Sequence, residues 1–188
     1  VSQTLFSVSL ISEVLPKLWE KNPAEGRKRL EEVRQLTRGA LAEMRTLLLE
    51  LRPDSLVEAE IGYLLTQLGE SITGRSRVPV QVSVKGTCSF PIEVKIALYR
   101  IAQEALNNVV KHAHASEAKV DLLCSGEGFT MKVIDNGKGF ITRTVSPASL
   151  GIGIMRERAR EIGARLSIIS SPGKGSIVTV RWKANRKE

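Results

Sequence analysis

Two long segments at the start of the chain place mostly apolar residues at alternating steps of three and four. They are Val1, Thr4, Val8, Ile11, Leu15 and Leu18 in the first segment, and Leu30, Val33, Thr37, Ala40, Met44, Leu47 and Leu51 in the second. This spacing predicts two amphipathic helices, each with one apolar seam. Between them, Asn22-Pro23-Ala24-Glu25 supplies an N-cap, a proline at the first helical position and a glutamate three residues after the cap. Pro53 ends the second helix.

A hairpin of two such helices cannot cover its apolar seam by itself. A second copy of the chain would complete the core, which predicts a homodimer built on a four-helix bundle. The alternative is that the hairpin packs on the rest of its own chain. The helical pattern breaks between Pro53 and Glu60, so we expect residues 1–56 to form the dimerisation unit and residues 57–188 a second domain.

The second domain mixes helical and strand periodicity. Helices are expected over 61–72, 91–113 and 154–162, and strands over 78–84, 119–124, 129–135, 165–170 and 176–182. Glycine turns between neighbouring strands indicate a mixed, largely antiparallel sheet with helices on one face. The predicted fold class is therefore α+β: a helical hairpin that forms a dimeric four-helix bundle, followed by an α/β sandwich.

The long helix of this domain carries polar side chains suited to a nucleotide and its metal ion. Glu104 and Asn108 lie four residues apart, on one helical face. The amide oxygen of Asn108 is a hard ligand that Mg²⁺ accepts beside water and phosphate oxygens, and Glu104 can polarise a water. Asn107 and Lys111 flank the pair where phosphates would lie. A solvated helix face with an ordinary i,i+4 pair would show the same residues.

Two glycine-containing segments follow. Asp135-Asn136-Gly137-Lys138-Gly139 ends a strand, and its Asn-Gly step is also a common hairpin turn. Asp135 could accept the exocyclic amine of adenine, while glycine lets the backbone approach the ring closely. Gly151-Ile152-Gly153 precedes the helix expected at 154–162, whose backbone amides and positive end would face phosphates. Each segment alone is also compatible with an ordinary loop.

In this order and spacing, the three segments resemble the ATP-binding region of sensor histidine kinases, which share a superfamily with the gyrase, mismatch-repair and heat-shock chaperone ATPases. The resemblance runs from about residue 61 to the end and implies binding of ATP and Mg²⁺, with Asp135 reading adenine, Asn108 holding the metal, and Glu104 and Lys111 acting in catalysis. It implies further nucleotide contacts from Asn107, Asn108, Lys111, His112, Gly137, Gly139, Gly151, Ile152, Gly153 and Ser176. Ser176 stands where the family usually has Thr, and keeps the hydroxyl. Residues 142–149 resemble the family's lid over ATP.

The stretch from Ala42 to Pro53 resembles the dimerisation hairpin of the histidine kinase branch that pairs with helix-turn-helix response regulators of the nitrate and desaturase systems. In that branch the first helix carries His-Asp, three variable residues and then Gln. Gln3 matches this Gln, so the phosphorylated His is expected five residues earlier, before Val1. The resemblance gives Gln3 the role of orienting a water that removes phosphate from the regulator. Neither His112 nor His114 matches the acceptor, so the given sequence is expected not to autophosphorylate.

Charge and composition exclude several other classes. The 188 residues carry a net charge of +8. The first 60 hold nine Lys or Arg against ten Asp or Glu, so the whole excess lies in the second domain, for which anionic ATP is a sufficient reason. Aromatic residues are few and not interleaved with basic ones, which argues against nucleic-acid binding. Cys88 and Cys124 lack metal-site spacing and indicate a reducing compartment.

These observations predict the core of a two-component sensor histidine kinase, which transfers the γ-phosphoryl of Mg²⁺-ATP to a His and then to an Asp of a response regulator. No apolar stretch reaches membrane length, so we expect a cytoplasmic location, with any membrane anchor of the parent protein in upstream segments. Two alternatives stay open. One is an ATPase of the gyrase or chaperone class, and the other is a non-enzymatic dimeric module that binds nucleotide without turnover.

Overall fold

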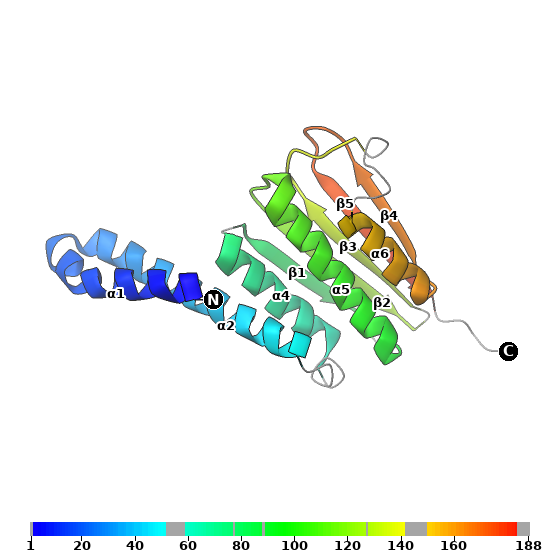
Figure 1. Cartoon of the computed structure of the whole chain (residues 1–188), viewed down its shortest axis with the longest axis horizontal. Helices are drawn as coiled ribbons and strands as arrows, with labels where there is room; N and C mark the ends of the chain where they lie inside the picture. Colours follow the sequence, from blue (N-terminus) through cyan, green and yellow to red (C-terminus); the bar gives the residue numbers. More distant parts are fainter. Residues whose placement is uncertain are drawn as a thin grey trace.

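The computed structural model of the chain describes residues 2–51, 59–76, 78–87, 89–126, 128–141 and 150–183. A helical hairpin projects from one end of a two-layer α/β sandwich (Figure 1). The hairpin consists of α1 (Ser2–Lys21) and α2 (Pro23–Leu51). Its turn confirms the predicted cap, because the backbone N–H of Glu25 donates to Asn22 Oδ1 at 3.2 Å. None of the described helices is long and apolar enough to cross a membrane.

Three helices and a short π-helical turn form one layer of the sandwich, and five strands form the other. The helices are α4 (Ile61–Ser76), α5 (Ile92–Asn108) with its π-helical continuation η1 (Val109–Ala113), and α6 (Leu150–Glu161). The strands are β1 (Val80–Lys85), β2 (Ala118–Ser125), β3 (Gly128–Asp135), β4 (Arg165–Ser170) and β5 (Ser176–Lys183). These elements confirm the predicted fold class of a hairpin followed by an α/β sandwich.

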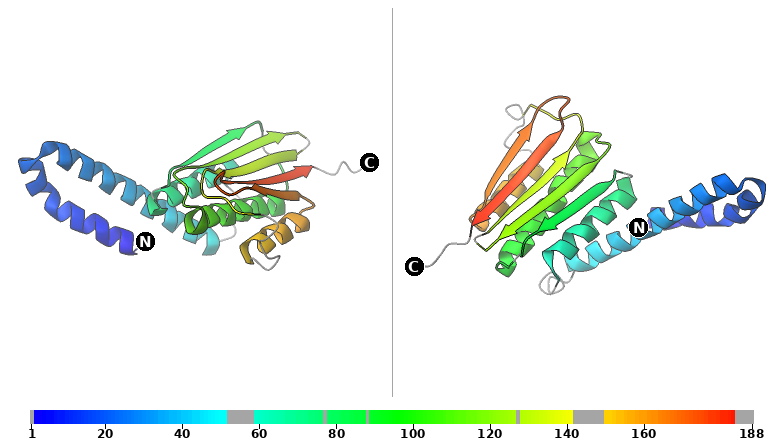
Figure 2. Two further views of the ribbon diagram at one scale, coloured as in Figure 1. Left: turned by 90° about the horizontal axis from the view of Figure 1, so that it is seen from above. Right: turned by 180° about the vertical axis from the view of Figure 1, so that it is seen from behind.

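The sheet has the order β1-β2-β3-β5-β4. β1 pairs with β2 in parallel, across the crossover through α5, and the other three pairs are antiparallel. All three helices lie on one face, and no helix of the described residues lies on the opposite face (Figure 2). Along β2 buried and exposed residues alternate, with Ala118, Val120, Leu122 and Cys124 pointing to the helices.

The core lies between this face of the sheet and α5, whose Leu98, Ile101 and Leu106 are fully buried. On one side α5 is flanked by α4, and α4 packs along α2 of the hairpin (Figures 1 and 2). A Cβ at Gly69 of α4 would lie 2.9 Å from a methyl group of Val82, so glycine lets α4 approach β1 closely. Among the described elements, the hairpin therefore meets the sandwich chiefly through α4.

Two local predictions were wrong. α6 begins at Leu150, so the glycines predicted to precede the helix lie in its first turn. The Asn-Gly step after β3 does not close a hairpin, because β3 pairs with β5 rather than with the next strand. Instead, Asn136 Oδ1 accepts the backbone N–H groups of Ser116 and Glu117 at 3.0 and 3.1 Å, and this fixes the chain at the start of β2. The predicted lid at 142–149 lies outside the described residues.

The cysteines also differ from the sequence-based expectation, since Cys124 is disulfide-bonded. Sequence spacing gave no sign of this, because the two cysteines of the chain are 36 positions apart. The parallel register pairs Lys85 with Leu123, so the chain that leaves β1 passes beside the end of β2. A Cβ at Gly86 would collide with the carbonyl oxygen of Cys124, which shows how close this approach is.

Two glycines with the same backbone conformation offer a test of the packing behind β3. Gly139 has a φ of 59° and a Cβ there would meet the carbonyl oxygens of Ser171 and Gly175, whereas Gly163 has a φ of 66° with open space around it. Gly163→Ala should lower the free energy of unfolding by about 1 kcal/mol, because alanine must adopt a left-handed backbone conformation there. Gly139→Ala should cost about 1–3 kcal/mol more because of the clash. Equal losses of unfolding free energy in the two variants, measured by denaturant titration, would contradict this packing.

Candidate functional site

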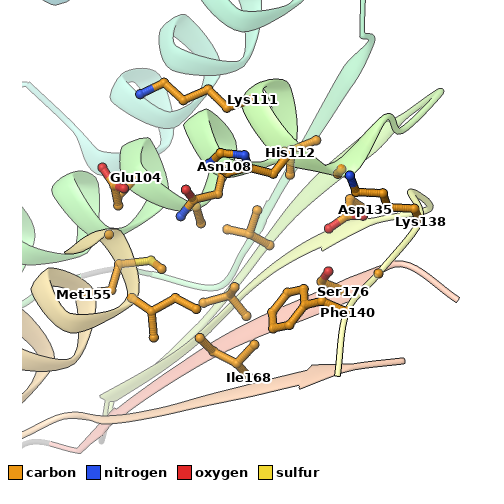
Figure 3. A pocket seen from close by; sticks show the side chains of 18 residues that line it. Glu104, Asn108, Lys111, His112, Asp135, Lys138, Phe140, Met155, Ile168 and Ser176 are labelled. Carbon is orange, nitrogen blue, oxygen red and sulfur yellow. The ribbon is translucent and has the colours of Figure 1, made fainter. Parts of the chain in front are cut away.

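A cavity of about 520 Å³ lies between α5 with η1, the first turns of α6, and the ends of β3 and β5. Its volume is that of an ordinary small-molecule site. It is lined by Glu104, Ala105, Asn108, Val109, Lys111, His112, Ala113, Val133, Asp135, Lys138, Gly139, Phe140, Gly151, Ile152, Met155, Ile168, Ser176 and Val178. In Figure 3 Glu104 and Met155 lie at one end, Asp135 and Lys138 at the other, and Ile168 and Phe140 along one side.

Asp135 forms one end of the cavity, at the last position of β3, where it is only 8% exposed. The backbone N–H of Gly137 donates to its Oδ1 at 2.9 Å. This bond fixes the carboxylate and leaves its second oxygen as an acceptor. The β3–β5 register pairs Asp135 with Ser176, so the two side chains lie next to each other on the helix-covered face. This end of the cavity therefore presents hydrogen-bond acceptors.

A hydroxyl network orients Ser176. Ser170 Oγ accepts the backbone N–H of Phe140 at 2.9 Å, donates to the carbonyl oxygen of Gly175 at 2.9 Å, and lies 3.1 Å from Ser176 Oγ. Since the single proton of Ser170 is used on Gly175, the hydroxyl of Ser176 must donate to Ser170. Ser176 therefore offers its lone pairs, rather than its proton, to the cavity. Ser170 had no sequence signal, because only the β4–β5 register brings it to the site.

The opposite end is formed by Glu104 and Asn108, one turn apart on α5, beneath the start of α6. A Cβ at Gly151 would collide with the carboxylate of Glu104 and lie 3.3 Å from the Asn108 amide nitrogen. Glycine at this position lets the first turn of α6 approach both side chains. After Asn108 the helix widens into the π-helical turn of η1, which carries Lys111 and His112 into the lining. Such π turns are common at functional sites.

Between its polar ends the cavity is apolar. Val133, Val178 and Ile168 lie opposite one another on β3, β5 and β4, and Ile152 and Met155 come from α6. A flat apolar group fits between side chains of this kind, with its polar edge at Asp135. The site thus combines two polar ends with an apolar middle.

The structure brings together nine of the residues that the sequence predicted for this site: Glu104, Asn108, Lys111, His112, Asp135, Gly139, Gly151, Ile152 and Ser176. Four others lie elsewhere. Asn107 Oδ1 accepts a hydrogen bond from Arg75 Nη2 of α4 at 2.8 Å, outside the lining. Gly137 packs on Ala113 instead of lining the cavity, and Gly153 is not in the lining either. Gln3 lies in α1, and its side chain is outside the described part of the chain.

Lys138, Phe140 and Met155 line the cavity and were missed as site residues. Lys138 stands between Gly137 and Gly139, which were both predicted as site residues. Its position in that segment was the signal that could have identified it. Phe140 and Met155 have no chemistry that distinguishes them in a sequence from other core residues.

The donor set fits a magnesium ion that binds together with a phosphorylated ligand. Among the described residues there is no cluster of three or more His, Cys, Asp or Glu side chains that would hold a metal alone. Glu104 and Asn108 supply a carboxylate and a carbonyl oxygen at one point of the cavity. Mg²⁺ is commonly held by one or two protein oxygens, with phosphates and water completing its octahedron.

Two family models match the chain. The model described as "Histidine kinase" matches residues 1–56, and the model described as "Histidine kinase-, DNA gyrase B-, and HSP90-like ATPase" matches residues 93–186. The first match covers the helical hairpin. The second covers half of the chain and contains every described segment that forms the cavity.

Curated relatives and solved structures agree with these matches. The chain is 35% identical to the sensor histidine kinase LiaS of Bacillus subtilis (strain 168), over 96% of the chain and 50% of that protein. It is 31% identical to the sensor protein VraS of Staphylococcus aureus (strain COL), over its whole length and 53% of that protein. The chain thus spans about half the length of these relatives.

Among solved structures, the histidine kinase domain of the Erythrobacter litoralis EL346 blue-light activated histidine kinase has a similar fold. Its TM-score is 0.57 at 23% sequence identity, over 96% of this chain and 95% of that one. At this identity the likeness concerns the fold alone. Taken with the two family models and the curated relatives, it leads to one assignment: the chain belongs to the sensor histidine kinase family, and joins a histidine kinase hairpin to an ATPase-type domain.

Proposed function

We propose that this chain is the dimerisation and catalytic core of a two-component protein-histidine kinase. The cavity binds ATP with Mg²⁺, the γ-phosphoryl group passes to a histidine on the hairpin, and from there to an aspartate of a response regulator. The observation that carries the proposal is the cavity itself, with acceptors at one end, an apolar middle, and carboxylate, amide and lysine at the other. The domain division at residues 56/57, the helix-turn-helix regulator partner and the role of each residue belong to the same proposal.

At the acceptor end, Asp135 recognises adenine. The exocyclic amine of adenine donates to the carboxylate oxygen that the Gly137 amide leaves available. Ser176 adds a second acceptor beside it, and the apolar side chains of β3, β5 and α6 hold the faces of the ring. This reading gives a reason for an almost buried carboxylate at the end of a strand that takes part in none of the described salt bridges.

At the other end, Asn108 and Glu104 would hold the metal and its water, and Lys111 and His112 would neutralise phosphate charge. Bound Mg²⁺ would supply charge neutralisation at the phosphates of ATP. The side chains of this chain position the γ-phosphoryl for an attacking imidazole, and the start of α6 closes over them. In phosphoryl transfer, positioning and electrostatic stabilisation account for most of the protein's contribution.

The acceptor histidine is proposed to lie five residues before Gln3, at the start of the first hairpin helix. Gln3 would then lie more than one helical turn along from the acceptor, where its carboxamide can orient a water for removal of phosphate from the regulator. The resemblance to the hairpins of the nitrate and desaturase branch supports both assignments. No observation favours a gyrase- or chaperone-type ATPase or a non-catalytic module over this reading.

Nucleotide binding tests the assignment of Asp135. Asp135→Asn can keep the bond from Gly137 through its amide oxygen, but its NH₂ group then faces the adenine amine, donor against donor. We expect the affinity for Mg²⁺-ATP, measured by calorimetry, to fall about 10- to 100-fold, because a buried hydrogen-bond donor is left without an acceptor. Asp121→Asn makes the same chemical change on the other face of the sheet and should bind like the parent protein. Unchanged affinity in folded Asp135→Asn would remove adenine recognition from this site.

An exposed apolar stripe on the hairpin supports the proposed homodimer. The predicted seam residues Val8, Ile11, Leu15 and Leu18 are half-buried, on the side of α1 that packs against α2. A second set of apolar side chains remains exposed on the hairpin, namely Phe6, Leu10, Val14, Leu41 and Met44. Phe6 alone is 65% exposed. Apolar surface of this extent on two adjacent helices is what a four-helix bundle would cover.

Sedimentation tests this dimer. Leu10→Glu places a charge in the exposed apolar stripe, so the variant should sediment as a monomer at concentrations where the parent protein is a dimer. Ser12→Glu adds the same charge about half a turn away on α1 and should leave the dimer intact. A parent protein that is monomeric at micromolar concentration, or equal effects of the two variants, would contradict the bundle.

A further inference from the structure

Six of the cations of the second domain lie on the face of the sheet that no described helix covers. Odd-numbered residues of β1, β2, β4 and β5 and even-numbered residues of β3 point to this open face, as the strand registers require. Its described cations are Lys85, Lys119, Lys132, Arg165, Arg181 and Lys183, all of them exposed. Its strands carry one acidic residue, Asp121, which pairs with Lys119 at 3.4 Å. ATP in the cavity cannot account for this charge, because the cavity lies on the other side of the sheet.

Two of these cations are placed at an energetic disadvantage. The β4–β5 register sets Arg165 directly opposite Arg181, on adjacent strands of the same face. Like charges directly opposed in an antiparallel pair destabilise a sheet. None of the salt bridges among the described residues involves either arginine. A repulsive pair of this kind is explained when an external anion binds to both guanidinium groups.

The arrangement of the open face points to the kind of anion. Its cations extend from Lys85 on β1 to Arg165 on β4, across four strand spacings or about 19 Å. Next to them, Ile134, Ile177 and Ile169 form an apolar row across β3, β5 and β4, and Ile169 is 66% exposed. A broad cationic face with an apolar margin matches an anionic lipid surface, which offers headgroups for the cations and acyl chains for the isoleucines.

Nucleic acid matches this face less well. No aromatic side chain lies on the described part of the open face, since Phe129 and Trp182 stack on each other on the helix-covered side. Single strands are normally bound by stacking on aromatic residues, and an exposed apolar row has no counterpart in a phosphate backbone. We therefore propose that the open face of the sheet is a docking surface for an anionic lipid bilayer. The cavity and α6 face away from a membrane bound in this way, so ATP keeps its access.

Co-sedimentation of the whole chain with lipid vesicles, in the absence of nucleotide, tests the proposal. Because this experiment does not depend on ATP, a failure to bind vesicles would leave the proposed kinase function untouched. The parent protein should bind phosphatidylcholine vesicles that contain phosphatidylglycerol, should not bind pure phosphatidylcholine, and should lose affinity as salt is raised. Arg165→Gln/Arg181→Gln should lower the partition coefficient of the protein onto these vesicles about 25-fold. Each cation lost near the surface contributes a factor of about five. The same variant should keep or raise the melting temperature, because a repulsive pair is removed.

The matched control is Arg156→Gln/Arg160→Gln, which removes the same charge from exposed positions of α6. These residues lie on the helix side of the sheet, farther from the open face by about the 10–12 Å diameter of a helix. This distance exceeds the Debye length at physiological salt, so vesicle binding should change little. Absence of binding to the anionic vesicles at low salt would overturn the proposal, and so would equal losses in the two variants. Tighter binding to duplex DNA or to polyglutamate than to the vesicles would assign the face to a different partner and would also overturn it.

Discussion

The burial of α5 is the constraint on which the rest of this structure depends. Leu98, Ile101 and Leu106 have no contact with solvent, so the rotation of the helix about its axis is fixed by the core. Once it is fixed, Glu104 and Asn108 must point toward α6 and the ends of the strands. Gly151 in the first turn of α6 and the carboxylate that ends β3 complete a cavity around that polar stripe. The site is therefore a consequence of helix packing, with its chemistry added at the boundary of the core.

The same helix connects the site to the hairpin. α4 lies between α2 and α5, and the hydrogen bond from Arg75 to Asn107 joins the last turn of α4 to the turn of α5 that precedes Asn108. Packed helices transmit small rigid-body shifts because protein cores do not deform continuously. A change in the hairpin therefore has a direct physical route, through α4, to the end of the cavity formed by Glu104 and Asn108.

Sequence reasoning predicted the elements well where periodicity was strong and the ends were marked. The cap at Asn22, the strand at 165–170 and the long helix through Ala113 were all found in this way. It failed where a contact between distant segments decided the outcome. The Asn-Gly step at Asn136 suits a hairpin locally, but the pairing of β3 with β5 overrides it. Ser170, Phe140 and the disulfide of Cys124 likewise depend on strand register, which single-sequence patterns do not specify.

The placement of the predicted site residues shows the same division. Glu104, Asn108 and Asp135 were predicted from their chemistry and spacing, and they line one cavity. Asn107 was predicted from its position next to Asn108 and lies outside that lining. Its contact with Arg75 depends on where α4 packs, and α4 carries no nucleotide motif. Composition likewise shows an excess of cations but does not locate them on the fold. That six of them share the open face becomes visible only when the five strands are set in register.

Transfer of radiolabel from [γ-³²P]ATP tests the central claim most directly, in the protein extended upstream to include the expected acceptor histidine. We expect label on the hairpin that is lost in acid and stable in base, as a phosphohistidine requires, and no label in the Asp135→Asn variant. Label that appears as free phosphate without a protein intermediate, or that is stable in acid, would contradict the assignment of this chain as a histidine kinase core.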